Sequence, residues 1–147
     1  MAKNKKLNLR KARLTDAPQL ASLSAELGYP VQLVELRARL RQVLKEPGHV
    51  VFVANDREPI GWIHACLNRS LEGGTFVEIV GLVVASHRRK MGIGAQLVSI
   101  VEEWVRKKRS SRIRVRTNVL RREAPLFYLT LGYVSKKKQE VFEKALF

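Results

Sequence analysis

The stretch Phe76–Ala95, FVEIVGLVVASHRRKMGIGA, combines three local signals in a fixed order. It opens with VEIVGLVV, a short run rich in Val and Ile that predicts a buried strand. The polar segment Ser86–Lys90 then ends the apolar run. Beyond Gly92 and Gly94, apolar residues recur on one stripe as far as Val105, which predicts an amphipathic helix. The sequence therefore predicts a strand, a basic glycine-containing loop and a helix.

A loop of this kind predicts a binding site for an anion, most naturally a phosphate. It turns successive backbone N–H groups toward one point, and the helix N-terminus adds partial positive charge. Glycines at positions 92 and 94 would let a diphosphate approach the backbone closely. Two common phosphate loops do not fit, because a dinucleotide-binding loop needs a glycine where Leu97 stands, and the chain has no Gly-Lys followed by Ser or Thr.

The remaining pattern, R-x-x-G-x-G after a strand, resembles the acyl-CoA pyrophosphate loop of the GNAT N-acetyltransferase superfamily. A second patch, Asn118–Tyr133 (NVLRREAPLFYLTLGY), resembles the other signature of that superfamily: an Asn closing a strand, a helix carrying Ala and Tyr, then Gly and an aromatic residue. The two patches lie in the superfamily's order and at its separation. The resemblance extends more loosely from LRKARLTDAPQLASL near the start of the chain to VFEKAL near its end.

This resemblance implies an α/β (α+β) fold. Its central sheet would be mixed and mostly antiparallel, with six to seven strands, of which strands 4 and 5 splay apart, and about four helices would flank it. A length of 147 residues predicts one domain, residues 1–147.

Local patterns place the elements along the chain. Strands are expected over residues 7–12, 50–54, 60–67, 77–84, 112–118, 133–138 and 140–146, the last two as an antiparallel pair that closes the sheet. Helices are expected over residues 16–27, 33–44, 94–108 and 124–131, with Thr15 as the N-cap of the first. Gly81 inside a strand indicates a bulge or a close approach by another backbone.

The resemblance also implies acetyl-CoA as co-substrate. Its pantetheine arm would lie between the splayed strands and hydrogen-bond the main chain of Leu82, Val83 and Val84. Its phosphates would lie on the loop made of Arg89, Lys90, Met91, Gly92, Ile93, Gly94 and Ala95. Asn118 would tie the end of the following strand to the cofactor arm.

Acetyl transfer to an amine needs a deprotonated amine, a stabilised oxyanion and a proton for the leaving thiolate. Tyr128 is the predicted acid, because a phenol is mostly protonated at neutral pH. Glu78 is the predicted base, although a carboxylate here could instead only orient the substrate. A strand N–H near Leu82 or Val83 is the predicted oxyanion donor. Tyr128 also has a purely structural alternative, in which its ring packs on the sheet.

For the remaining candidate residues, the sequence favours a structural role or leaves the role open. Cys66 is the single cysteine, so it predicts neither an internal disulfide nor a metal site. His64 shares a strand face with Trp62 and Cys66, and we favour a structural role because no acidic residue is its neighbour in sequence. Tyr29 and Pro30 are candidates for contact with the acceptor, with a plain interhelical turn as the alternative.

The charge leaves two classes of partner open. With 28 Lys and Arg against 13 Asp and Glu, the net charge is +15, which suits a polyanion such as RNA or a ligand as anionic as CoA. No nucleic-acid-binding motif accompanies the charge, and aromatic residues are only 7%, so nucleic acid is disfavoured.

The predicted function is therefore acetyl-CoA-dependent N-acetylation of a primary amine on a small molecule or peptide. The alternative is a CoA-sensing or RNA-associated basic binding protein without catalysis. No apolar run is long enough to span a bilayer, and the first residues lack the core of a signal peptide, so a cytoplasmic location is expected. A homodimer is left open.

Overall fold

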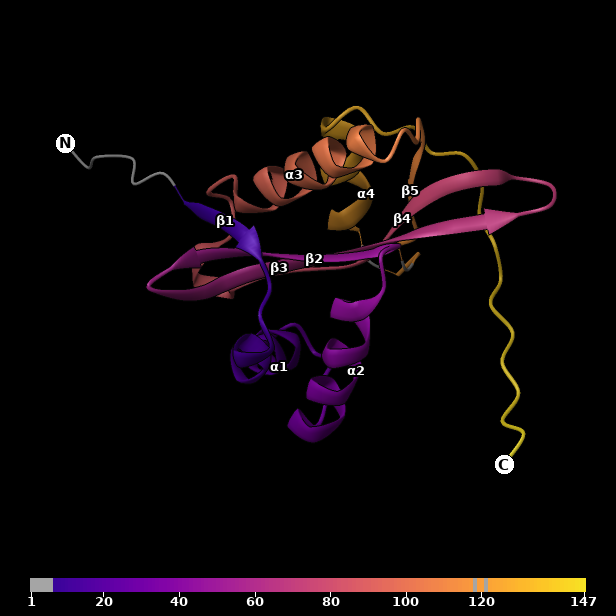
Figure 1. Ribbon diagram of the computed structural model, residues 1–147. Helices are drawn as coiled ribbons and strands as arrows, with labels where there is room; N and C mark the ends of the chain where they lie inside the picture. The colour runs from indigo at the N-terminus through magenta and orange to yellow at the C-terminus, as the bar shows by residue number, and fades with distance from the viewer. Residues whose placement is uncertain (1–6, 118, 121) are drawn as a thin grey trace. The chain divides into compact units, whose positions relative to one another are not determined.

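The computed structural model describes residues 7–117, 119–120 and 122–147 (Figure 1). The chain divides into two compact units, Met1–Arg116 and Thr117–Phe147. All the strands of the described residues lie in the first unit. The second unit holds one helix, α4 (Glu123–Thr130).

The first unit is built on one five-stranded sheet in the order β1-β2-β3-β4-β5. Its strands are β1 (Asn8–Lys11), β2 (His49–Asp56), β3 (Glu58–Ser70), β4 (Gly74–Val84) and β5 (Ile113–Val115). Neighbouring strands are antiparallel except β4 and β5, which are parallel. The prediction of a mixed, mostly antiparallel sheet is therefore confirmed, but the sheet has five strands where six to seven were predicted.

The missing strands are the two predicted near the C-terminus. Residues 133–147 contain no helix or strand, so the predicted pair over 133–138 and 140–146 is wrong. The run Lys136–Lys138 interrupts any alternation of apolar and polar residues, and a lone hairpin is only marginally stable. Val141, Phe142 and Phe147 consequently remain exposed.

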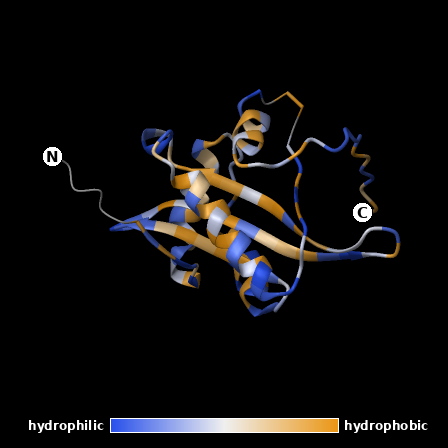
Figure 2. Cartoon of the chain, turned by 90° about the horizontal axis from the view of Figure 1, so that it is seen from above, coloured by the Kyte–Doolittle hydropathy of each residue, from blue (hydrophilic) through white to orange (hydrophobic). Residues whose placement is uncertain are grey.

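Helices cover both faces of the sheet (Figure 1). The helices α1 (Ala17–Glu26) and α2 (Leu33–Lys45) lie on one face, and α3 (Ile93–Lys107) lies on the other. Leu97, Val98 and Val101 of α3 are fully buried, as the predicted stripe requires. Figure 2 shows hydrophobic residues along the middle of the strands and hydrophilic residues at the β2–β3 turn.

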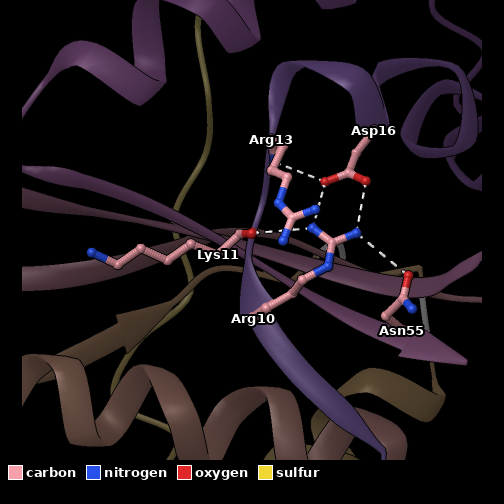
Figure 3. Close-up of polar contacts among 5 residues, drawn as sticks. All are labelled: Arg10, Lys11, Arg13, Asp16 and Asn55. Atoms are coloured by element: carbon pink, nitrogen blue, oxygen red, sulfur yellow. Dashed lines mark hydrogen bonds and ion pairs between the residues drawn. The ribbon is translucent and has the colours of Figure 1, made fainter.

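The first helix begins differently from the prediction. Thr15 lies inside a short 3-10 turn (Leu14–Asp16), and α1 starts at Ala17. Asp16 serves as the polar anchor, because its carboxylate accepts hydrogen bonds from the Arg13 N–H at 2.7 Å and from the Arg10 guanidinium at 2.8 Å (Figure 3). The Arg10 bond lowers the pKa of Asp16. The prediction of Thr15 as the N-cap is therefore wrong. The N-cap of α1 is Asp16, whose carboxylate links the helix to Arg10 of β1.

The middle of β4 is irregular. The β3–β4 register shifts between His64 and Ala65, so that Val80 is an extra residue on β4 and Gly81 lies opposite His64. A Cβ atom on Gly81 would lie 2.8 and 2.9 Å from two ring carbons of Trp62. The predicted bulge is therefore present, and the close neighbour of Gly81 is a side chain.

The pairing of β4 with β5 ends directly before this point. Strand β5 pairs with β4 only at Val77, Glu78 and Ile79. Strand β4 continues to Val84, and no strand of the described residues lies beside that part of its edge.

Candidate functional site

The open edge of β4 presents the backbone of particular residues. The Ala85 N–H donates to the Ile60 carbonyl at 2.8 Å, across the β3 side. Because backbone groups alternate in direction along a strand, Val83 also faces β3, whereas Leu82 and Val84 face the open edge. Of the three residues predicted to meet the pantetheine arm, Leu82 and Val84 are therefore suitably directed. The N–H of Val83 points toward β3 and so is not directed at the open edge.

The loop after β4 ends in two left-handed residues. Lys90 has φ +62° and Gly92 has φ +81°, and Gly92 is the N-cap of α3. A Cβ on Gly92 would meet nothing within 4 Å, so the backbone conformation, and not crowding, is the local reason for glycine here. The first N–H groups of an α-helix have no acceptor within the helix. Those of α3 therefore begin where the loop ends, as the anion-site prediction requires.

Polar contacts tie this loop to the rest of the first unit. Arg88 donates to the Asp56 carboxylate at 2.5 Å, next to the β2–β3 turn. The N–H and hydroxyl of Ser86 both donate to the Glu26 carboxylate at the end of α1, and this contact lowers the pKa of Glu26. Arg89 and Lys90 are exposed. Part of the loop is thus anchored, while two cationic side chains remain accessible to an anion.

Glu78 lies on β4 where β5 is still paired with it. Its side chain is 12% exposed, and Oε1 lies 3.1 Å from Nε of Arg116. The side-chain amide of Asn68 donates to Oε2 at 3.4 Å. Cys66 is directly opposite on β3, and burial, together with Glu78, raises the pKa of its thiol. Glu78 is therefore a nearly buried carboxylate that already has a cationic partner.

A pair of histidines on the same face of the sheet was missed by sequence reasoning. Nδ1 of His49 lies 3.0 Å from Nε2 of His64, and Nε2 of His49 lies 3.2 Å from the Glu46 carboxylate. Burial first, and then His49, lowers the pKa of His64 to about 4. The acidic member of this line, Glu46, contacts His49 and reaches His64 only through that ring. A regular hairpin centred on Arg57 would place position 49 opposite 65, and only the register shift between Ala54 and Asn55 brings it diagonally next to 64, so spacing alone gave no signal.

Tyr128 belongs to the second unit, on α4. Its ring meets Phe127 at 4.9 Å and Tyr133 at 5.6 Å between centroids, both edge to face. It is 8% exposed, and burial raises the pKa of its phenol to about 12. The phenol is therefore protonated throughout the physiological range. Asn118, the predicted tie to the cofactor arm, lies outside the described residues.

The turn between α1 and α2 carries a shallow hollow. Its lining residues are Pro30, Val31, Gln32, Glu35 and Arg39. Tyr29 precedes this hollow and is 54% exposed. Pro30, one of the two residues predicted to meet an acceptor, thus lines a concave surface.

Metal-binding clusters and membrane-spanning helices are absent from the described residues. No group of three or more His, Cys, Asp or Glu side chains is arranged to hold a metal ion in the part of the chain that the structure describes. No helix within those same residues has the length and apolar character needed to cross a membrane.

The first unit brings several predicted residues onto one continuous segment. Glu78, Leu82 and Val84 lie along β4, and the glycine loop and the start of α3 follow without interruption. This segment offers a strand edge for an extended ligand and a set of N–H groups for its anionic end. A Cβ on Gly61 of β3 would meet Ile93 and Leu97 of α3, so His64, of opposite parity on that strand, lies on the other face of the sheet. Glu78, opposite Cys66, shares that face.

Sequence comparison gives a match over most of the chain. The model of the acetyltransferase (GNAT) family matches residues 14–133. The aminoglycoside N(6')-acetyltransferase type 1 of Serratia marcescens is 22% identical over 116 residues, which are 75% of this chain and 80% of that protein.

Structure comparison gives the same fold. A protein from Bacillus halodurans C-125, described as a transcriptional regulator, superimposes with a TM-score of 0.86 at 22% identity, covering 95% of this chain and all of that one. The aminoglycoside acetyltransferase AAC(6')-Iy, in complex with the bisubstrate analogue CoA-S-monomethyl-acetylneamine, gives a TM-score of 0.85 at 18% identity, covering 96% of this chain and 99% of that one.

Proposed function

The chain belongs to the acetyltransferase (GNAT) family, and from this membership we propose that it moves an acetyl group from acetyl-CoA to a primary amine. One observation carries the proposal. The β4 strand loses its neighbour β5 after Ile79 and runs, with its edge open, to Val84, and a loop containing a 3-10 turn (Ser86–Arg88) then leads to the left-handed residue Gly92. An extended ligand with a diphosphate at one end matches both features.

The residues of this segment fit acetyl-CoA chemically. The outward-facing backbone of Leu82 and Val84 can pair with the amide groups of the pantetheine arm, as an added strand would. The N–H groups of Ile93, Gly94 and Ala95, at the N-terminus of α3, can hold the diphosphate. Arg89 and Lys90 add positive charge in the loop before them. When bound, acetyl-CoA supplies the activated acetyl group.

Two side chains and one backbone group would then perform the transfer. The Leu82 N–H donates to the thioester oxygen as negative charge develops there. Glu78 attracts the ammonium group of the acceptor or takes its proton, directly or through a water. Tyr128 gives its proton to the leaving thiolate. Its high pKa keeps that proton available at neutral pH.

We further propose that both compact units belong to one acetyltransferase domain. The family match runs from residue 14 to residue 133 and so crosses the boundary between Arg116 and Thr117. We place the reaction in the cytoplasm, where acetyl-CoA is available.

The acceptor of the S. marcescens relative is an aminoglycoside by its name, and such compounds are polycations. A site for a polycation needs several carboxylates that have no other partner. Here the net charge is +15, Glu78 is paired with Arg116, and Asp56 is paired with Arg88. We therefore propose a neutral or anionic molecule with one amine, or a peptide N-terminus, as a better acceptor than an aminoglycoside.

The test is acetyl-CoA turnover with four amines: kanamycin, glucosamine, glucosamine 6-phosphate and a short peptide with a free N-terminus. We expect turnover with at least one, and a higher kcat/KM for glucosamine 6-phosphate than for glucosamine at low salt. Glu78→Gln should slow the reaction, and Glu72→Gln, at an exposed position of the β3–β4 turn, is its control. A higher kcat/KM for kanamycin than for the other three would contradict the acceptor assignment.

The competing function is CoA-sensing or RNA binding without catalysis, which the high positive charge favours. It predicts acetyl-CoA or RNA binding but no acetyl transfer to any of the four amines. RNA binding through clustered Lys and Arg alone would collapse steeply as salt rises. A selective RNA complex that survives moderate salt, together with no turnover, would favour this alternative.

A further inference from the structure

The line of polar groups from His64 through His49 to Glu46 joins a buried sheet face to solvent. His64 on β3 is about half-way along the strand, and its Cα partner on β4 is Gly81, just past the point where β5 leaves the sheet. The Glu46 side chain at the other end is 60% exposed. The two contacts between them are 3.0 and 3.2 Å long, which is hydrogen-bond range.

The proton positions in this line follow from the acceptor at its end. A carboxylate only accepts, so His49 Nε2–H donates to Glu46. A neutral His49 then accepts at Nδ1, which requires that His64 donate from Nε2–H. This arrangement leaves the lone pair of His64 Nδ1 without a partner within the line. His64 is thereby set in the tautomer that a base at Nδ1 requires.

The surroundings of His64 favour a neutral imidazole that transfers a proton onward over one that stays protonated. Ala17 and Leu20 of α1 and Leu40 of α2 belong to the apolar core cluster on this face. Ser24 of α1 is a buried polar residue without charge. The charged or titratable groups around His64 are His49 on β2, Glu46 before β2, Cys66 on its own strand, and Glu78 with Arg116 from β4 and the end of β5. Burial and His49 both oppose a lasting positive charge on His64.

We propose that His64, His49 and Glu46 form a proton relay that removes the proton of the acceptor amine during acetyl transfer. This inference rests on the proposed function. Glu78, already paired with Arg116, attracts and orients the ammonium group, and His64 is the catalytic base. His49 and Glu46 are positioning residues that act through it.

Each proton in the relay moves by one position. The ammonium proton adds to His64 Nδ1, the His64 Nε2 proton passes to His49 Nδ1, and the His49 Nε2 proton passes to the Glu46 carboxylate and then to water. One proton leaves the amine and one reaches solvent, and both rings end neutral in the opposite tautomer. The reverse shift, with water at His64 Nδ1 in place of the amine, resets the line.

The first test needs no substrate. Long-range ¹H–¹⁵N NMR spectra of the full-length protein report the tautomer and charge of each imidazole as pH is lowered, and the third histidine, exposed His87, is the internal reference. We expect His64 as the Nε2–H tautomer, neutral well below pH 6.5, the ordinary pKa of an imidazole. We expect His49→Gln to change its tautomer population. Ordinary titration of His64, or a mixture of tautomers that His49→Gln leaves unaltered, would overturn the relay whatever the protein catalyses.

The second test uses the fastest of the four amines. His64→Gln and His49→Gln should each lower kcat at least tenfold at pH 7, with a smaller loss as pH approaches the pKa of the amine. Glu46→Gln should lower kcat less, and Glu72→Gln is its exposed control. The KM for acetyl-CoA should not change. A uniform loss at every pH would assign these residues a structural role and refute the relay, while absence of turnover in the wild type would refute the proposed function instead.

Discussion

The phenol of Tyr128 is held in a cluster of three aromatic rings, so its removal can be separated from a change in packing. Tyr128→Phe keeps the edge-to-face contacts with Phe127 and Tyr133 and removes only the hydroxyl group. We expect acetyl-CoA binding to be retained and turnover to fall about a hundredfold or more, because the thiolate loses its proton donor. A pH–rate profile beside the wild type measures this.

Equal rates for the two proteins at every pH, with chemistry shown to be the slow step, would mean that water protonates the thiolate. The assignment of Tyr128 as general acid would then be wrong, and its ring would have only the structural role that the sequence also allowed.

His64 predicts a pH dependence of stability. Burial lowers its pKa from about 6.5 to about 4, so between these values the unfolded chain binds a proton that the folded chain does not. Its contribution to the free energy of unfolding is therefore complete above pH 6.5 and is lost as pH falls toward 4. Denaturant unfolding at about pH 7 and about pH 5 should show a smaller loss for His64→Gln than for the wild type. An identical loss in both would contradict the shifted pKa.

Some residues of the candidate site could be predicted from the sequence, and others could not. Gly92 was identifiable because glycine most readily adopts the positive φ that a chain needs where a loop turns into a helix. The His49–His64 contact depends on strand register, which a bulge between Ala54 and Asn55 also alters, so it could not be read from spacing alone. The choice of Leu82 over Val83 as the outward N–H depends likewise on the extra residue Val80.

Among the elements, β4 determines the site because it loses its second neighbour, β5, after Ile79 and carries an extra residue, Val80, at the same point. Gly81 is essential to that change, since Trp62 occupies the place of a side chain. Gly81→Ala should lower the free energy of unfolding by about 1–3 kcal/mol, the usual cost of overpacking, as measured by denaturant titration.

The matched control for this substitution is Gly48→Ala. Its Cβ would lie 3.5 Å from the Leu67 Cβ, an ordinary contact, so a change within about 0.5 kcal/mol is expected. Equal effects of the two substitutions would show that Trp62 moves aside freely and that the bulge does not depend on glycine.

The elements themselves were predictable where their periodicity was strong. The stripe of α3 and the apolar core of β4 correspond to buried residues such as Leu97 and Val77. The pattern at the C-terminus was weaker, and a strand cannot form there without a partner for its backbone. The ends of β2 and β3 extend beyond their apolar residues, because hydrogen bonding between the two strands continues past the hydrophobic pattern.

At the scale of the whole molecule, the charge of +15 supports both an anionic co-substrate and an acceptor that is not a polycation. The same field could attract RNA, so the charge alone does not select a function. Acetyl-CoA binding at the glycine loop is the claim on which the enzymatic account depends.

Calorimetry with acetyl-CoA tests that claim most directly. Gly92→Glu places a carboxylate where the diphosphate would bind, and Gly74→Glu is its control, because it adds the same charge at another glycine with positive φ (+71°) and open surroundings. We predict that the wild type and Gly74→Glu bind acetyl-CoA with similar affinity and that Gly92→Glu, shown to be folded, does not bind measurably. Unchanged affinity in Gly92→Glu would contradict the account.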